Sequence, residues 1–301
     1  MFPFFEAGHQ LSVAMVVLYA LLAAASLSIR FATRGATPSM LGHQVNAWWR
    51  IFPLVTLALL AYPLGLAALG ALVCVLAALE LQSHYDGPRR RFRLGAAALL
   101  IGALGLGALA PALAPVLVAA VLVVQALRYR RRPGRGALLW LMLLATTCAM
   151  LVLAAFTTLP FGARTNLAWA FYLFIVTALN DIAQFVSGKL FGRHKIAPGV
   201  SPNKTWQGLA GGIAVSQAVS LALGSYLALA APLTLSVFAL LLALAGFAGD
   251  LMFSAAKRRL GVKDFSTLIP GHGGILDRVD SLVLTAPLLY CLLRIIDQGT
   301  P

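Results

Sequence analysis

Long apolar runs constrain this chain more than any other feature of its sequence. Hydrophobic residues make up 60% of its 301 residues and charged residues only 11%, whereas a water-soluble domain has about a quarter charged residues. Such runs suit the roughly 20 apolar residues that cross a bilayer core as a helix. Backbone groups in lipid must bond within their own segment, and the alternation typical of barrel strands is absent. The sequence therefore predicts an all-α, polytopic transmembrane protein.

Ten apolar segments are apparent, several of them short, and they predict about 8–10 spans with cytosolic polar loops forming the site. Pro63 divides the second segment from the third and Pro111 the fourth from the fifth, although 51–81 is also long enough for one tilted span. The segments lie near 11–29, 48–62, 64–81, 94–109, 112–128, 137–158, 167–187, 208–229, 232–252 and 280–296.

The positions of the basic residues favour two helices over one span at 51–81. If both proline-divided stretches are hairpins, then of the 23 Lys and Arg residues only Arg164 and Arg294 lie on the far side of the membrane. The positive-inside rule makes the basic side cytosolic, which predicts both termini outside the cytosol. The same rule accounts for most of the net charge of +14, so we expect no nucleic-acid partner.

The chain divides by character into two regions. Residues 1–160 are predicted to be N-terminal transmembrane helices with arginine-rich loops, and 161–301 a C-terminal catalytic transmembrane region with two polar loops. Most of the nine acidic residues lie in or beside those two loops. They are Asp181, Asp250, Asp264, Asp277 and Asp280.

The first polar stretch begins on a predicted helix. Asn180, Gln184 and Ser187 recur on one face of that helix, and Asp181 is adjacent to the face. An acid this close to a membrane span is a candidate site residue because a charge in hydrocarbon is expensive. The alternative is that Asp181 lies at the water interface.

Residues 201–205 then have the pattern of a helix start. The free N–H groups of a helix N-terminus attract an anion, and Lys204 there is a candidate phosphate ligand. The same Ser-Pro-Asn pattern also makes ordinary turns.

The second polar stretch carries the more specific pattern. Asp250, Ser254 and Lys257 share one helix face, and so do Asp277 and Asp280. Acids on one face repel each other unless a cation or a proton relieves them. Mg²⁺ needs one or two carboxylates together with substrate phosphate oxygens. This stretch therefore predicts a magnesium site.

Basic residues and glycines complete this stretch. Glycines 273 and 274 follow His272 and allow backbone N–H groups to approach a ligand closely. Phosphoryl or nucleotidyl transfer requires a metal, cationic groups and alignment, and all three are present here. A solvated juxtamembrane loop would explain the bases at 257–259, but not the three aspartates and the glycine turn.

At these residues the chain resembles the phosphatidate cytidylyltransferase family, also called CDP-diacylglycerol synthases. The likeness is strong over about 180–285, and the wording of 180–184 suggests a side branch of the bacterial family. The matching motifs are Asp181…Gly188, Ser201-Pro202-x-Lys204-Thr205, Ser254, Lys257-Arg258, Lys263-Asp264, His272-Gly273-Gly274 and Asp277-Arg278-Val279-Asp280.

The resemblance implies that CTP and phosphatidic acid give CDP-diacylglycerol and pyrophosphate by metal-assisted attack of the lipid phosphate on the CTP α-phosphate. It implies Mg²⁺ with room for a second cation, membrane lipid as a partner and a homodimer. It also implies an integral protein of the bacterial inner membrane whose active-site loops face the cytosol.

The resemblance and the residue chemistry together assign roles. Catalytic candidates are Asp250, Asp277, Asp280, Lys257 and Arg278. The metal ligands, or their close supports, are Asp250, Asp277 and Asp280. The candidates for substrate binding are Asp181, Ser201, Lys204, Ser254, Arg258, Lys263, His272, Gly273 and Gly274.

Two departures from the family pattern keep alternatives open. Phe253 and Gln207 stand where Glu is common, and the loss of two acids would alter metal affinity or lipid choice. The alternatives are a CTP-dependent lipid kinase of the polyprenol type and a catalytically inactive homologue. A transporter is disfavoured because the first half of the chain has almost no intramembrane acids.

Overall fold

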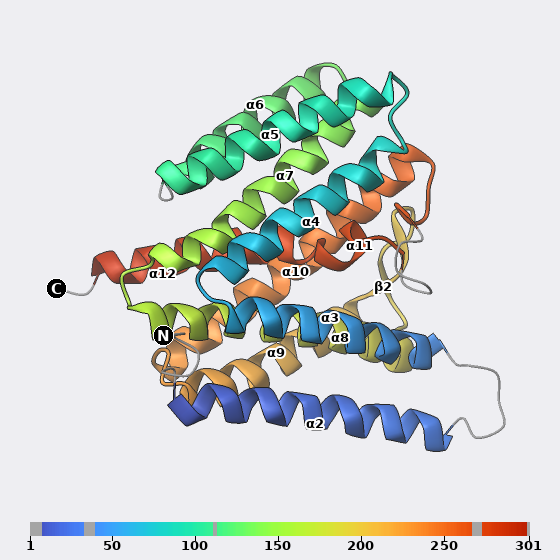
Figure 1. Cartoon of the computed structure of the whole chain (residues 1–301). Coiled ribbons are helices and arrows are strands. Elements are labelled where there is room, and N and C mark those ends of the chain that lie inside the picture. The colour runs from blue at the N-terminus through green and yellow to red at the C-terminus, as the bar shows by residue number, and fades with distance from the viewer. Residues whose placement is uncertain (1–7, 33–39, 111–112, 267–272, 300–301) are drawn as a thin grey trace.

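The protein is described by a computed structural model, which covers residues 8–32, 40–110, 113–266 and 273–299 (Figure 1). Helices dominate these ranges because the apolar segments satisfy their backbone hydrogen bonds internally. They are α2 (Gly8–Ala32), α3 (Met40–Leu60), α4 (Leu64–Gln82), α5 (Arg89–Leu109), α6 (Ala114–Arg131), α7 (Arg135–Ala155), η1 (Phe156–Thr158), α8 (Ala163–Phe191), α9 (Trp206–Tyr226), α10 (Pro232–Leu260), α11 (Leu276–Val279) and α12 (Leu282–Gly299).

The predicted all-α polytopic architecture is confirmed. Within the described ranges, 8 helices are long and apolar enough to cross a membrane. Two further helices match predicted segments but are not among these eight. They are α3, whose apolar part is only Trp48–Leu60, and α6, whose last turn holds three arginines. The stretch 51–81 forms two helices, α3 and α4, with a turn at 61–63 between them.

The helices bring the basic segments to one end of the molecule. In Figure 1, α2 begins and α12 ends on the left, whereas α2, α8 and α10 end on the right. This is the arrangement expected if both proline-divided stretches are hairpins. That this end faces the cytosol stays a prediction from the positive-inside rule.

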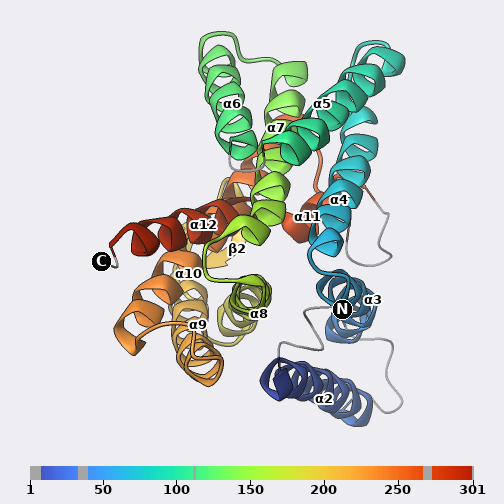
Figure 2. The same cartoon turned by 60° about the vertical axis from the view of Figure 1, so that its left-hand side comes forward.

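The core centres on α7, which is the most deeply buried of the candidate spans and stands in the middle of the molecule in Figure 2. It packs against α4, α6 and α12. One buried cluster includes Leu139 of α7 together with Leu66 of α4 and Leu289 of α12. The division into 1–160 and 161–301 stays a prediction, and this cluster draws on both regions.

A small β-hairpin corrects one sequence prediction. Strands β1 (Lys195–Ala197) and β2 (Ser201–Thr205) pair antiparallel. The predicted helix start at Ser201 is therefore wrong, because a residue before proline favours extended backbone. The helix begins later, at Trp206, and Thr205 caps it by accepting a hydrogen bond from the Gly208 N–H at 3.1 Å.

Close helix packing brings two acids of the second polar stretch together. A Cβ on Gly249 of α10 would lie 2.4 Å from the carbonyl oxygen of Asp280, at the junction of α11 and α12. No side chain fits in that space without a shift of backbone. Glycine at this position therefore lets α10 place Asp250 beside Asp280.

We predict that Gly249→Ala destabilises the protein by about 1–3 kcal/mol, the usual cost of overpacking a dense interior. The matched control is Gly102→Ala in α5, where a Cβ meets nothing within 4 Å and alanine favours a helix. Thermal unfolding of both variants in detergent checks this. Equal unfolding midpoints for the two variants would contradict the close approach.

Candidate active site

The predicted site residues come from four neighbouring elements and the loops between them. Asp181 lies on α8, whereas Ser201 and Lys204 lie on β2. Asp280 joins α11 to α12, Lys263 follows α10, and His272 lies outside the described residues. Gly273 and Gly274 precede α11, which carries Asp277 and Arg278, and α10 carries Asp250, Ser254, Lys257 and Arg258.

The first charge pair joins the β-hairpin to α10. Lys204 Nζ forms an ion pair with Asp250 Oδ2, and the two side chains are 18% and 25% exposed. Lys204 Nζ also donates to Gln184 Oε1 at 3.4 Å and lies 5.5 Å from the centre of the Phe247 ring. A lysine on β2 and an acid on a membrane helix thus meet in a partly dry environment, where their attraction is stronger than in water.

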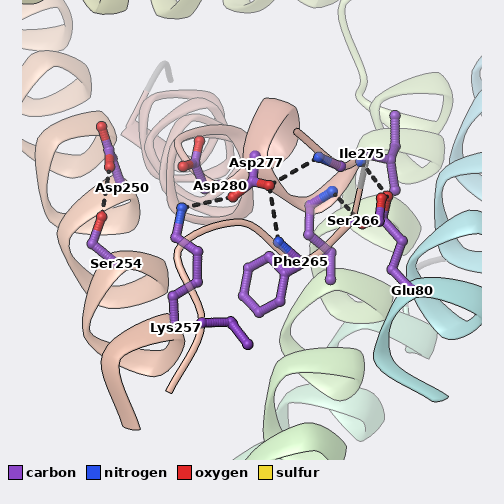
Figure 3. Close-up of polar contacts among 12 residues, drawn as sticks. Glu80, Asp250, Ser254, Lys257, Phe265, Ser266, Ile275, Asp277 and Asp280 are labelled. Atoms are coloured by element: carbon purple, nitrogen blue, oxygen red, sulfur yellow. Dashed lines mark hydrogen bonds and ion pairs between the residues drawn. The ribbon is translucent and has the colours of Figure 1, made fainter. Parts of the chain in front are cut away.

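The second charge pair is more deeply buried. Lys257 Nζ lies 2.6 Å from Asp277 Oδ1, with side chains 12% and 4% exposed. The other oxygen of Asp277 accepts hydrogen bonds from the backbone N–H of Gly274 at 2.9 Å and of Phe265 at 3.3 Å (Figure 3). Asp277 therefore ties α10, the segment after α10 and the start of α11 together.

The third acid of the predicted triad is also buried. Asp280 is 8% exposed, and its Oδ1 accepts a hydrogen bond from the Ser281 N–H at 2.8 Å. The carboxylates of Asp181, Asp250 and Asp280 lie close enough for their charges to repel, and the charge of Lys204 attracts that of Asp181 as well as that of Asp250. Such a group of acids attracts a cation.

The predicted helix face on α10 is confirmed by one direct contact. Ser254 Oγ donates to Asp250 Oδ1 at 3.2 Å, as the spacing of four residues requires. Arg258 instead turns toward the hairpin, where its Nε donates to the carbonyl of Val200 at 3.1 Å. Lys263 and Arg278 are exposed.

The acids suit Mg²⁺ in their chemistry, since it prefers carboxylate and phosphate oxygens. No group of three or more His, Cys, Asp or Glu side chains in the described ranges is arranged to hold a metal ion. Mg²⁺ needs only one or two carboxylates when substrate phosphates complete its shell. Asp250 and Asp280 are neighbouring carboxylates and meet that number. Both oxygens of Asp250 have protein partners, Lys204 and Ser254, as do both oxygens of Asp277.

Glu80 is a residue of this region that the sequence analysis missed. It lies in the last turn of α4, is 5% exposed and accepts three hydrogen bonds from the segments around α11. Its donors are Ser266 Oγ at 2.7 Å, Ile275 N at 2.6 Å and Leu276 N at 3.1 Å. In the sequence, Glu80 is marked only as an acid just inside the end of an apolar run. Acids at the membrane–water interface give the same pattern, so the pattern did not single Glu80 out.

The two residues that depart from the family pattern, Gln207 and Phe253, both contact neighbouring segments of the chain. Gln207 Oε1 accepts hydrogen bonds from the backbone N–H groups of Arg193 at 3.1 Å and His194 at 3.2 Å. Phe253 is 1% exposed and packs edge-on against Phe265, with ring centres 6.3 Å apart. These two positions therefore stabilise the hairpin and the segment after α10.

A cytidylyltransferase family model matches residues 43–296. The chain belongs to this family. Among similar curated proteins, the phosphatidate cytidylyltransferase of Brucella suis is 46% identical over 131 residues, or 44% of this chain and 47% of the relative. That of Staphylococcus saprophyticus is 41% identical over 129 residues, or 42% and 50%. The uncharacterized protein YnbB of Escherichia coli K12 is 46% identical over 123 residues, or 41% of each chain. The matches thus span about half the length of these relatives.

We predict that Lys257→Met destabilises the protein by about 3–5 kcal/mol, because it leaves the buried Asp277 carboxylate without its cation. Combining it with Asp277→Asn should cost less than the sum of the two single changes. Unfolding of the single and double variants gives the coupling free energy. Lys263→Met, an exposed change, should shift stability by no more than about 0.5 kcal/mol. Strictly additive losses at 257 and 277 would contradict the pair.

Proposed function

We propose that this protein is a phosphatidate cytidylyltransferase, which converts CTP and phosphatidic acid into CDP-diacylglycerol and pyrophosphate. The observation that carries the proposal is the pair of Lys–Asp contacts, Lys204 with Asp250 and Lys257 with Asp277, beside Asp280. Membership of the cytidylyltransferase family and the names of the curated relatives support it.

The reaction needs neutralisation of charge more than removal of a proton. A lipid phosphate is already ionised near neutral pH, so its oxygen can attack the α-phosphorus of CTP directly. The bond from that phosphorus to the pyrophosphate oxygen breaks, and pyrophosphate leaves with the electron pair. Catalysis then depends on alignment of the two phosphates and on cations around them.

The polar residues take distinct roles in this proposal. Lys204 and Lys257 are half-buried point charges that contact phosphate oxygens of CTP. Asp250 and Asp280 would hold Mg²⁺, which when bound would neutralise phosphate charge. Asp277 supports the site by orienting Lys257 and the backbone at Gly274.

The remaining candidates surround these groups. Arg258, Lys263 and Arg278 are exposed bases that would bind the lipid headgroup or the outer phosphates. Asp181 and Ser201 are second-tier positions at the site. Ser254, His272, Gly273 and Gly274 would contribute to substrate binding.

The membrane supplies the second substrate. We propose that acyl chains reach the site laterally from the leaflet, while CTP enters from the cytosol at the basic end of the bundle. We propose a bacterial inner membrane as the location. The positive-inside rule supports a site on its cytosolic side. A homodimer is the assembly that the family resemblance implies.

The test uses purified protein in detergent–phosphatidate micelles with labelled CTP and Mg²⁺. We expect label in CDP-lipid and an equal amount of pyrophosphate. Asp250→Asn and Asp277→Asn should each lower turnover by about a hundredfold or more, as loss of electrostatic stabilisation does. Asp86→Asn changes an exposed acid paired with Arg135 and should leave turnover unchanged.

The products separate the alternatives. Release of CDP with phosphate on the lipid would identify a CTP-dependent lipid kinase. Absence of turnover with several phospholipid acceptors, in a protein that folds, would identify an inactive homologue. Near-normal turnover of Asp250→Asn would overturn the assigned site.

A further inference from the structure

A buried acid of α4 holds the segments that carry the signature residues. Glu80 belongs to the N-terminal region, far in sequence from the motifs at 254–280. Its two carboxylate oxygens accept hydrogen bonds from Ser266, Ile275 and Leu276. In Figure 3, the backbone at Ile275 lies between the side chains of Glu80 and Asp277.

Glu80 and Asp277 bind adjacent residues of the same two segments. Asp277 Oδ2 accepts from Phe265 N at 3.3 Å and from Gly274 N at 2.9 Å. Each donor of this pair is the chain neighbour of a donor to Glu80. A shift of either carboxylate would therefore move the groups that the other one holds.

A side chain in the turn after α4 contacts the same segment. His84, one turn beyond Glu80, has its Nε2 atom 2.8 Å from the carbonyl oxygen of Phe265. Because a carbonyl oxygen only accepts hydrogen bonds, the His84 Nε2 atom carries the proton here. The turn after α4 thus bonds the backbone at 265, and the last turn of α4 bonds the side chain at 266.

The burial of Glu80 makes these contacts mutually dependent. It is 5% exposed, and no ion pair in the described ranges includes it. A buried carboxylate needs hydrogen-bond donors, and the backbone donors at 275 and 276 likewise need an acceptor. Hydrogen bonds to a charged acceptor are roughly twice as strong as neutral ones.

We propose that Glu80 is a positioning residue that sets the orientation of Asp277 and, through it, of Lys257 Nζ toward the CTP phosphates. The proposal rests on the proposed function, because it assigns Glu80 a role in the same reaction. Glu80 contacts neither the substrate nor the metal ion. Its effect passes through the backbone at 274–276.

The variants are Glu80→Ala, Glu80→Gln and the control Asp86→Ala. Alanine removes all three acceptor contacts. Glutamine keeps one acceptor oxygen but sets an amide N–H₂ against one of the donors. The control removes an acid six residues further along, which is exposed and paired with Arg135 at 3.6 Å.

Kinetics distinguish positioning from plain structural support. We expect Glu80→Ala to raise KM for CTP about tenfold, because Lys257 Nζ is no longer held toward the CTP phosphates. The half-saturating Mg²⁺ concentration should rise with it, because phosphate oxygens of CTP complete the shell of the metal ion. Glu80→Gln should give a smaller shift in the same direction, and Asp86→Ala no shift. Turnover lowered only in proportion to the folded fraction, with both saturation curves unchanged, would overturn the proposal.

Hydrogen exchange separates failure of the positioning role from failure of the proposed function. We expect Glu80→Ala to speed amide exchange in the peptide 273–279, relative to Asp86→Ala, while the peptide 201–210 stays unchanged. If Glu80→Ala speeds exchange but the wild-type protein has no cytidylyltransferase turnover, the contact of Glu80 is supported and the proposed function is rejected. Unchanged exchange would reject the positioning role even in an active enzyme. Should Glu80→Ala fail to fold, Glu80→Gln and His84→Ala apply the same criteria.

Discussion

The carboxylate of Asp277 is the contact on which the rest of the site depends. One oxygen bonds Lys257 of α10, and the other bonds the backbone N–H groups of Phe265 and Gly274, both in the segment between α10 and α11. Removal of one partner would leave a buried charge unsatisfied, which costs more than the pair itself contributes. The side chains, the glycine turn and the start of α11 therefore form one unit.

The membrane makes this kind of organisation necessary. Charged groups next to hydrocarbon must be paired, hydrogen-bonded or held at an aqueous edge. Two ion pairs satisfy this requirement, Lys204 with Asp250 and Lys257 with Asp277. Glu80 is instead hydrogen-bonded, to three donors. The N-terminal helices thus contribute to the site through α4, besides anchoring the chain in the membrane.

The sequence predicted most of the helices and indicated the acids of the candidate site, because both leave local patterns. Apolar length marks a span, and spacing of four residues placed Ser254 beside Asp250, as the hydrogen bond between them shows. Two features lay beyond such patterns. The strand at Ser201–Thr205 depends on pairing with β1 and on Pro202. Glu80 accepts hydrogen bonds from donors 186 to 196 residues away in the sequence. A local sequence pattern cannot predict a contact between residues so far apart.

A structure with a non-hydrolysable CTP analogue and Mg²⁺ would test the central claim most directly. The measured quantity is the position of the triphosphate relative to Lys204, Lys257 and the acids of α10 and α11. The account predicts phosphate oxygens in contact with both lysines, and the metal ion between Asp250 and Asp280. A triphosphate bound elsewhere, for example among the arginines at the start of α5 and the end of α6, would contradict it.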